Sequence, residues 1–209
     1  MLLYSYTSYA YLIWQTRIFS ATMVHMRSLH LARPRAIMMV GVPGSGKSFF
    51  ASQFSQTFST PFIDSETITA ITNDRAISGR IIALLLTEIC KTNQTFILEG
   101  NSETKVLRAE FAEFAKKHGY DPLFVWVQAD PSISRQRSAK KGRNQESYES
   151  TMQRFEAPTE SERALVVSGR HTYATQLRMV LNHIGNDNRP PVVHERQPSP
   201  VVPVRKRIQ

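Results

Sequence analysis

The chain has 209 residues, of which 41% are hydrophobic and 21% charged, and its formal net charge is +9. This length suffices for one domain with a full core, and the composition is ordinary for a soluble globular protein. The single cysteine, Cys90, excludes an intrachain disulfide and a zinc site built on cysteines. A reducing compartment agrees with this cysteine usage, and we expect a cytoplasmic protein.

The positive charge is unevenly spread along the chain. No acidic residue precedes Asp64, and the C-terminal end adds Arg205, Lys206 and Arg207. A basic balance favours acidic partners such as nucleotides or nucleic acid. Basic ends on a near-neutral domain would produce the same net charge, so the charge leaves both interpretations open.

Residues 1–32 are interpreted as an extension, because they are rich in aromatic residues and poor in charge. The apolar run at 9–14 is too short to span a bilayer, and no basic segment precedes it as in a secretory signal. We therefore expect no membrane association. An organelle transit peptide and a true start at Met23 or Met26 are alternatives, and a dispensable extension is the interpretation we favour.

Residues 186–209 differ from the rest of the chain at the other end. They hold five of the eleven prolines and almost no hydrophobic periodicity. Such a segment buries too little apolar surface to offset its ordering entropy, so a disordered basic tail is expected. The folded domain is accordingly predicted over residues 33–185.

Within that domain, short apolar runs alternate with amphipathic segments. In chain order the pattern predicts a strand at 36–40, a helix from Lys47, a strand at 61–63, a helix capped at 64 or 65, a helix at 77–91, a strand at 95–98, a helix at 102–118, a strand at 123–127, a basic helix at 131–141, a helix at 148–155, a strand at 164–167 and a helix at 171–184. This alternation predicts an α/β fold with a five-stranded parallel sheet and helices on both faces.

The first predicted strand leads into the motif G-x-x-x-x-G-K-S at residues 41–48. Its glycines let the backbone turn sharply and aim amides at phosphate oxygens. Lys47 reaches the β- and γ-phosphates, and the hydroxyl of Ser48 holds Mg²⁺. Because the motif opens an amphipathic helix, we interpret it as a P-loop for ATP and Mg²⁺. The expected nucleotide contacts are Gly41, Val42, Pro43, Gly44, Ser45, Gly46, Lys47, Ser48 and Phe49.

Carboxylates follow the second and third predicted strands. Asp64 and Glu66 follow the second strand, at the strand end where α/β proteins place ligands. Asp64 is the candidate base that accepts a proton from an attacking hydroxyl, and it is also a candidate helix cap. Glu99 ends the third strand and is the candidate organiser of Mg²⁺ through water. Glu66 and Asn101 are candidates for substrate contact.

The helix predicted at 131–141 carries a cationic cluster and is interpreted as a small basic helical lid over the triphosphate. Arg135 is the first candidate for neutralising charge on the transferring phosphoryl group, alongside Lys47. Arg137 and Arg108 are candidates for binding substrate, Arg108 through a substrate phosphate. A basic solvated face is the alternative for the cluster, whose other members are Lys140, Lys141 and Arg143.

These features together resemble the polynucleotide-kinase-like P-loop kinases, a group filed as small AAA domains and related to zeta toxins and gluconate-type kinases. The resemblance rests on the P-loop, an acid after strand two, an acid-Gly-Asn sequence after strand three and a late arginine helix. It covers about residues 36–185. It implies a five-stranded parallel core, Mg²⁺-ATP and a catalytic aspartate at Asp64.

The sequence departs from this family pattern at three places. The family often has Asp-x-x-Arg after strand two, whereas position 67 is Thr, so Glu66 is an alternative counterpart of the aspartate. The acid after strand three is Glu99 rather than Asp. The lid has Arg135-Gln136-Arg137 in place of Arg-x-x-x-Arg.

The resulting expectation is an ATP-dependent kinase that transfers the γ-phosphate to a hydroxyl of a nucleic-acid end or a small metabolite. The alternative is a regulatory NTPase that binds ATP and has no phosphoacceptor. We expect a monomer, because no sensor or arginine-finger segment of an oligomeric motor follows residue 185.

Overall fold

The computed structural model of this protein describes residue 31 and residues 33–187. The predicted extension at 1–32 lies outside the described residues except for residue 31, and the predicted tail at 186–209 except for 186 and 187. Within the described part of the chain, none of the helices combines the length and the apolar character that crossing a membrane requires.

The predicted five-stranded parallel sheet is confirmed. Its strands are β1 (Arg35–Val40), β2 (Phe62–Asp64), β3 (Phe96–Glu99), β4 (Asp121–Gln128) and β5 (Leu165–Ser168). Their order is β2-β3-β1-β4-β5, and every pair is parallel. The P-loop strand β1 is therefore central, and Asp64 lies beside Glu99 in the register of β2 and β3.

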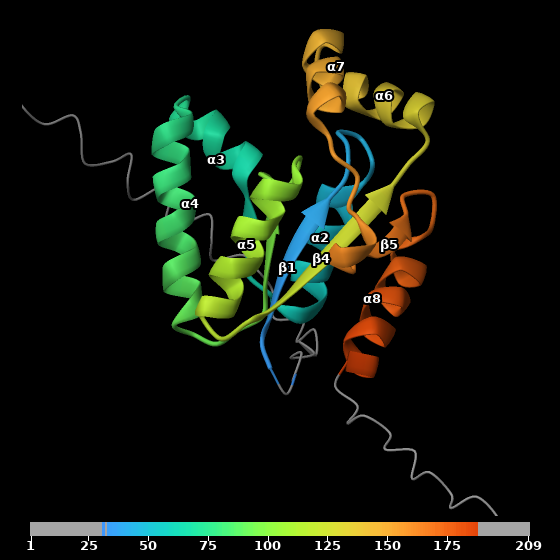
Figure 1. Ribbon diagram of the computed structural model, residues 1–209. Coiled ribbons are helices and arrows are strands. Elements are labelled where there is room, and N and C mark those ends of the chain that lie inside the picture. The colour runs from blue at the N-terminus through green and yellow to red at the C-terminus, as the bar shows by residue number, and fades with distance from the viewer. Residues whose placement is uncertain (1–30, 32, 188–209) are drawn as a thin grey trace, which may run out of the picture.

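Helices cover both faces of this sheet (Figure 1). They are α2 (Lys47–Phe58), α3 (Ser65–Thr72), α4 (Arg75–Cys90), α5 (Lys105–Lys117), α6 (Pro131–Lys140), α7 (Gln145–Arg154) and α8 (Tyr173–Asp187), with a short 3-10 turn η2 (Glu160–Glu162). Since β1 has neighbours on both faces, all six of its residues are buried. Ala36, Met38 and Val40 pack toward the α4 and α5 side, while Ile37 and Met39 pack toward α2 and α8.

Side-chain caps explain where several helices begin. Asp74 accepts hydrogen bonds from Ala76 and Ile77, so α4 begins at Arg75, before the predicted start at 77. The helix predicted from 102 begins at Lys105, because Thr104 caps it. The helix predicted from 148 begins at Gln145, because Asn144 caps it. The sequence pattern therefore located each element, and the caps set its first residue.

The segment 131–155, which contains α6 and α7, stands beyond the C-terminal ends of β1 and β4 (Figure 1). This is the position predicted for the lid, and we use that name for it below. Ser134 and Ser138 of α6 are buried against the P-loop, and a Cβ added to Gly44 would lie 2.1 Å from the Ser134 carbonyl oxygen. The lid therefore contacts the P-loop backbone directly.

Candidate functional site

The P-loop follows β1 and takes a backbone path that only glycine accepts at three points. Gly41, Gly44 and Gly46 have φ values of 141°, 78° and 110°. Gly46 precedes α2 without a side-chain cap, so the first amides of α2 point into the loop unused by any capping side chain. Amides at a helix N-terminus are suited to bind phosphate oxygens. Phe49, also predicted to contact nucleotide, lies in the first turn of α2 with an exposed ring.

Neighbouring elements hold this loop from two sides. Ser45 is fully buried, and a Cβ on Gly169, in the loop between β5 and α8, would lie 2.1 Å from the Ser45 carbonyl oxygen. A Cβ on Gly41 would lie 2.5 Å from the Val127 carbonyl oxygen at the end of β4. Glycine at these positions allows backbone to pack on backbone, which makes the loop rigid before nucleotide arrives.

Lys47, Ser48 and Glu99 form the centre of the site. The Lys47 ammonium donates to the Val42 carbonyl oxygen at 3.0 Å, and the Ser48 hydroxyl donates to Glu99 Oε1 at 2.9 Å. Burial lowers the pKa of Lys47, and the nearby carboxylate of Glu99 opposes this shift. Burial also raises the pKa of Glu99, while Lys47 and the Ser48 hydroxyl oppose it.

The chemistry of this centre fits a magnesium ion. Glu99 is 8% exposed, and its second carboxylate oxygen, Oε2, is buried without a hydrogen-bond partner. A buried carboxylate oxygen beside a serine hydroxyl is a suitable ligand for Mg²⁺ or its bound water, because Mg²⁺ prefers oxygen ligands and keeps several waters. The described residues contain no group of three or more His, Cys, Asp or Glu side chains that could hold a metal by themselves. Phosphate oxygens and water would therefore complete the shell.

Asp64 and Asn101 both lie next to this centre, at the C-terminal ends of neighbouring strands. Asp64 caps α3, since its Oδ1 accepts from the Glu66 amide at 3.0 Å and its Oδ2 from the Thr67 hydroxyl at 2.7 Å. It also influences Glu99 electrostatically. Asn101 is exposed in the turn after β3 with a φ of 51°, a left-handed conformation that asparagine tolerates. Both residues thus lie at the C-terminal edge of the sheet, and their predicted roles stay predictions.

The lid arginines point to different places. The Arg135 guanidinium lies 5.7 Å from the centroid of the Tyr148 ring and 3.8 Å from Glu149, both on α7. Arg137 donates to the Gly169 carbonyl oxygen at 3.2 Å, which places it at the β5 edge of the sheet, away from Asp64. Their predicted roles in catalysis and substrate binding stay predictions.

Arg143 is the lid cation that the sequence argument did not single out. It follows Gly142, which ends α6 with a φ of 80°, and its guanidinium donates to the carboxylate of Glu66. Arg143 also acts on Lys47 electrostatically, lowering the lysine pKa. It therefore connects the lid to α3 across the P-loop. The sequence signal was the arginine directly after the glycine that ends the basic helix.

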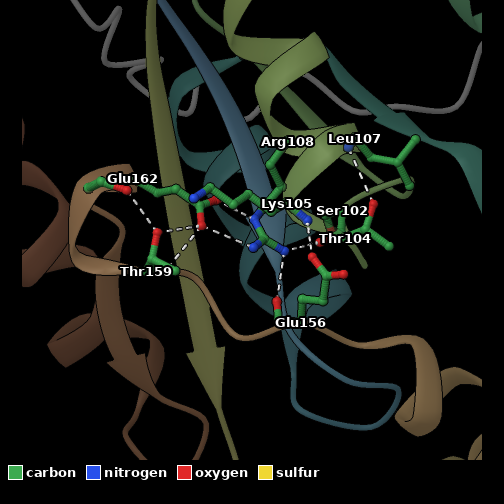
Figure 2. A network of polar contacts seen from close by, with 9 residues as sticks. Ser102, Thr104, Lys105, Leu107, Arg108, Glu156, Thr159 and Glu162 are labelled. Carbon is green, nitrogen blue, oxygen red and sulfur yellow. Dashed lines mark hydrogen bonds and ion pairs between the residues drawn. The ribbon is translucent and has the colours of Figure 1, made fainter.

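Arg108 is buried and paired in this structure, an arrangement that disfavours its predicted contact with substrate phosphate, and that contact stays a prediction. Its side chain is fully buried and forms a two-pronged ion pair with Glu162, with contacts at 2.6 and 3.1 Å. The same guanidinium donates to the carbonyl oxygens of Ser102 and Glu156 (Figure 2). These bonds occupy the guanidinium and fasten the segment after the lid to the loop between β3 and α5.

Comparison with known proteins agrees with this architecture. A family model described as an AAA domain matches residues 37–164, which is more than half of the chain. No curated protein matches the chain.

Several solved structures share the fold. A gluconokinase from Sinorhizobium meliloti 1021 superposes with a TM-score of 0.55 at 20% identity, covering 74% of this chain and 94% of that one. The Mycobacterium tuberculosis APS kinase CysC in complex with AMPPNP and APS gives 0.59 at 15% identity, covering 73% and 98%. Chaetomium thermophilum Kti12 in complex with ADP-AlF3 gives 0.56 at 17% identity, covering 74% and 100%. At these identities the likeness shows the P-loop fold alone.

Proposed function

This chain belongs to the AAA domain family, and on that premise we propose that it is an ATP-dependent kinase of the polynucleotide-kinase-like group. It transfers the γ-phosphate to a hydroxyl of a nucleic-acid end or a small metabolite. The observation that carries the proposal is the grouping of Lys47, Ser48, Glu99 and Asp64 at the C-terminal ends of adjacent parallel strands. Two similar structures are kinases, the gluconokinase and the APS kinase with AMPPNP, and a third, Kti12, holds ADP-AlF3; these likenesses support nucleotide binding.

Phosphate binding falls to the P-loop amides and Lys47. The turn at Gly44 and Gly46 and the first turn of α2 present backbone amides to the β- and γ-phosphates of ATP. Lys47, which here donates to the Val42 carbonyl oxygen, reaches the γ-phosphate when ATP binds. Magnesium would be held by Ser48, with Glu99 directly or through water, and when bound it neutralises charge on the phosphates.

Proton transfer falls to Asp64. The hydrogen bonds from Glu66 and Thr67 hold its carboxylate beside the end of β3. The acceptor hydroxyl gives its proton to Asp64 as its oxygen forms a bond to the γ-phosphorus. The bond between that phosphorus and the β,γ-bridging oxygen breaks, and ADP leaves. Glu66 is the alternative base, although its carboxylate is paired with Arg143.

The lid supplies positive charge to the transferring group. Arg143 lowers the pKa of Lys47, after the larger effect of burial, and donates to Glu66, so we propose it for this role beside Arg135. Replacing each arginine with alanine separates the two. A loss of kcat about 100-fold or more is expected for the residue that contacts the phosphoryl group, with a small effect for the other.

The test of the proposal is transfer of labelled γ-phosphate to a panel of acceptors. The panel holds 5′-hydroxyl DNA and RNA, nucleosides, sugars and sugar nucleotides, with Lys47→Ala as the inactive control. Label on an acceptor with wild type, and none with the control, is the expected result. Absence of ATP binding by the wild-type protein would overturn the proposal.

The second candidate is a regulatory NTPase without a phosphoacceptor. It is favoured by one observation, the Glu66–Arg143 ion pair, which joins α3 to the lid across the site. Asp64→Asn distinguishes the two functions, because the amide keeps an oxygen that can cap α3 but cannot take the acceptor proton. A kinase loses about 10²- to 10⁴-fold in transfer and keeps its ATP affinity, whereas a regulatory NTPase keeps both binding and slow hydrolysis.

A further inference from the structure

We propose that the phosphoacceptor of this enzyme is a small hydroxyl compound without negative charge, a neutral or amine-bearing polyol or sugar, and that phosphorylated acceptors and oligonucleotides are excluded. The inference rests on the proposed kinase function and specifies its substrate class. It is carried by the distribution of charged side chains around the ends of β2 and β3, where Asp64 and Glu99 lie side by side.

The first observation concerns Arg108, the arginine closest in sequence to Glu99. Arg108, on the second turn of α5, would be the natural ligand for an acceptor phosphate, because a guanidinium binds phosphate with two prongs. It is instead fully buried, and both prongs contact Glu162. Breaking a buried pair leaves an uncompensated buried charge, so an incoming phosphate does not draw Arg108 out of its place.

The second observation is the excess of carboxylates that remain. Lys47 and Glu99 act most strongly on each other, and next come the carboxylates Asp64, Glu66 and Glu103 and the guanidinium of Arg143. Glu103 is half-buried in the loop between β3 and α5. Apart from Glu99, which is the candidate magnesium ligand, three carboxylates thus stand with two cations, Lys47 and Arg143.

The third observation is that Lys47 and Arg143 already have other roles and do not bind the acceptor. Lys47 belongs to the P-loop and reaches the phosphates of ATP. Arg143 is paired with Glu66, and when it leaves that carboxylate it neutralises the transferring group. When Arg143 moves away, Glu66 loses its ion-pair partner, and the acceptor side of the site carries more negative charge at the moment of reaction.

The consequence for substrate choice follows from electrostatics. An acceptor that carries a phosphate brings negative charge beside carboxylates in a partly buried site, where like charges repel more strongly than in water. A neutral polyol offers hydroxyl groups that donate to the same carboxylates, and an ammonium group on the acceptor is attracted to them. The side chains of Asp64 and Glu66 then orient the acceptor by accepting its hydroxyl hydrogens.

Matched acceptor pairs test this inference with the full chain and Mg²⁺-ATP. The pairs are glucose with glucose 6-phosphate and adenosine with adenosine 3′-monophosphate, and glucosamine is added as an amine-bearing sugar. The measurement is kcat/KM for each compound, taken with wild type, Glu103→Gln and Glu113→Gln. Glu113 is the matched control, because it is an exposed glutamate on the same helix as Arg108 but outside the carboxylate group.

The expected result is that the member of each pair without phosphate has the higher kcat/KM, by about tenfold or more. Glu103→Gln is expected to narrow the ratio of the two kcat/KM values by roughly 3- to 10-fold, since it removes one repelling charge. Glu113→Gln is expected to leave the ratio unchanged. Preference for the phosphorylated members, or a ratio that responds equally to both variants, overturns the inference while the kinase function stands. Transfer to none of the compounds, nor to the oligonucleotides of the earlier panel, overturns both.

Discussion

Replacing Arg108 with methionine is the change whose cost the structure defines most clearly. The methionine removes a guanidinium with no exposed surface and leaves the Glu162 carboxylate, which is only 10% exposed, without its ion-pair partner. The carbonyl oxygens of Ser102 and Glu156 also lose their donor. Removing one partner of a buried ion pair costs about 3–5 kcal/mol, because the remaining charge stays buried.

A loss of this size is measurable by equilibrium unfolding. For a domain of this length each kcal/mol lowers Tm by roughly 2–4 °C, so Arg108→Met is expected to lower Tm by about 10 °C. The double variant Arg108→Met with Glu162→Met is expected to recover much of the loss, since apolar residues replace a buried pair at little cost. Arg108→Lys keeps the charge but not the two-pronged geometry, and an intermediate loss is expected.

The opposite outcome would indicate that Arg108 binds substrate. If Arg108→Met lowers the free energy of unfolding by less than about 1 kcal/mol and raises the acceptor KM tenfold, the buried ion pair is not its role. Measuring stability and KM on the same preparations separates the two. The structure predicts a large effect on stability and, at temperatures where the variant is folded, a small effect on KM.

Three further predictions concern backbone fit and pH. Gly100→Ala is expected to disrupt the turn after β3, because its φ is 121° and the new Cβ would overlap the Ser65 hydroxyl; thermal unfolding and ATP binding check this. Gly79→Ala is expected to stabilise the protein by about 0.5–1 kcal/mol, since Gly79 lies inside α4 with open space around its Cα; the denaturation midpoint checks it. The hydrogen bond from Arg108 lowers the pKa of Glu162. The difference in free energy of unfolding between wild type and Glu162→Gln is therefore expected to be full above about pH 4.5 and to shrink as the pH falls further. Unfolding curves measured over a pH series check this, and a difference that does not decrease would contradict the pairing.

Local sequence patterns were sufficient to predict the secondary-structure elements and to locate the P-loop. Short apolar runs of three to five residues predict buried strands, and all five strands were found where expected. The P-loop could be recognised because its backbone conformation depends on glycines within one short segment. Helix starts were displaced by up to three residues, because caps such as Thr104 and Asn144 carry no strong periodic pattern.

The roles of the arginines, by contrast, were decided by tertiary structure. Arg108 and Glu162 are 54 residues apart, and Arg143 and Glu66 are 77 apart. No local pattern indicates which of several arginines will meet a carboxylate from a distant segment. Burial then determines the outcome, because a guanidinium enclosed with one carboxylate is a structural ion pair, whereas a partly exposed guanidinium is free to exchange its partner for a phosphate. Sequence alone thus established an α/β domain with a P-loop, and only the packing of distant segments determined which of its arginines are buried in an ion pair and which stay partly exposed.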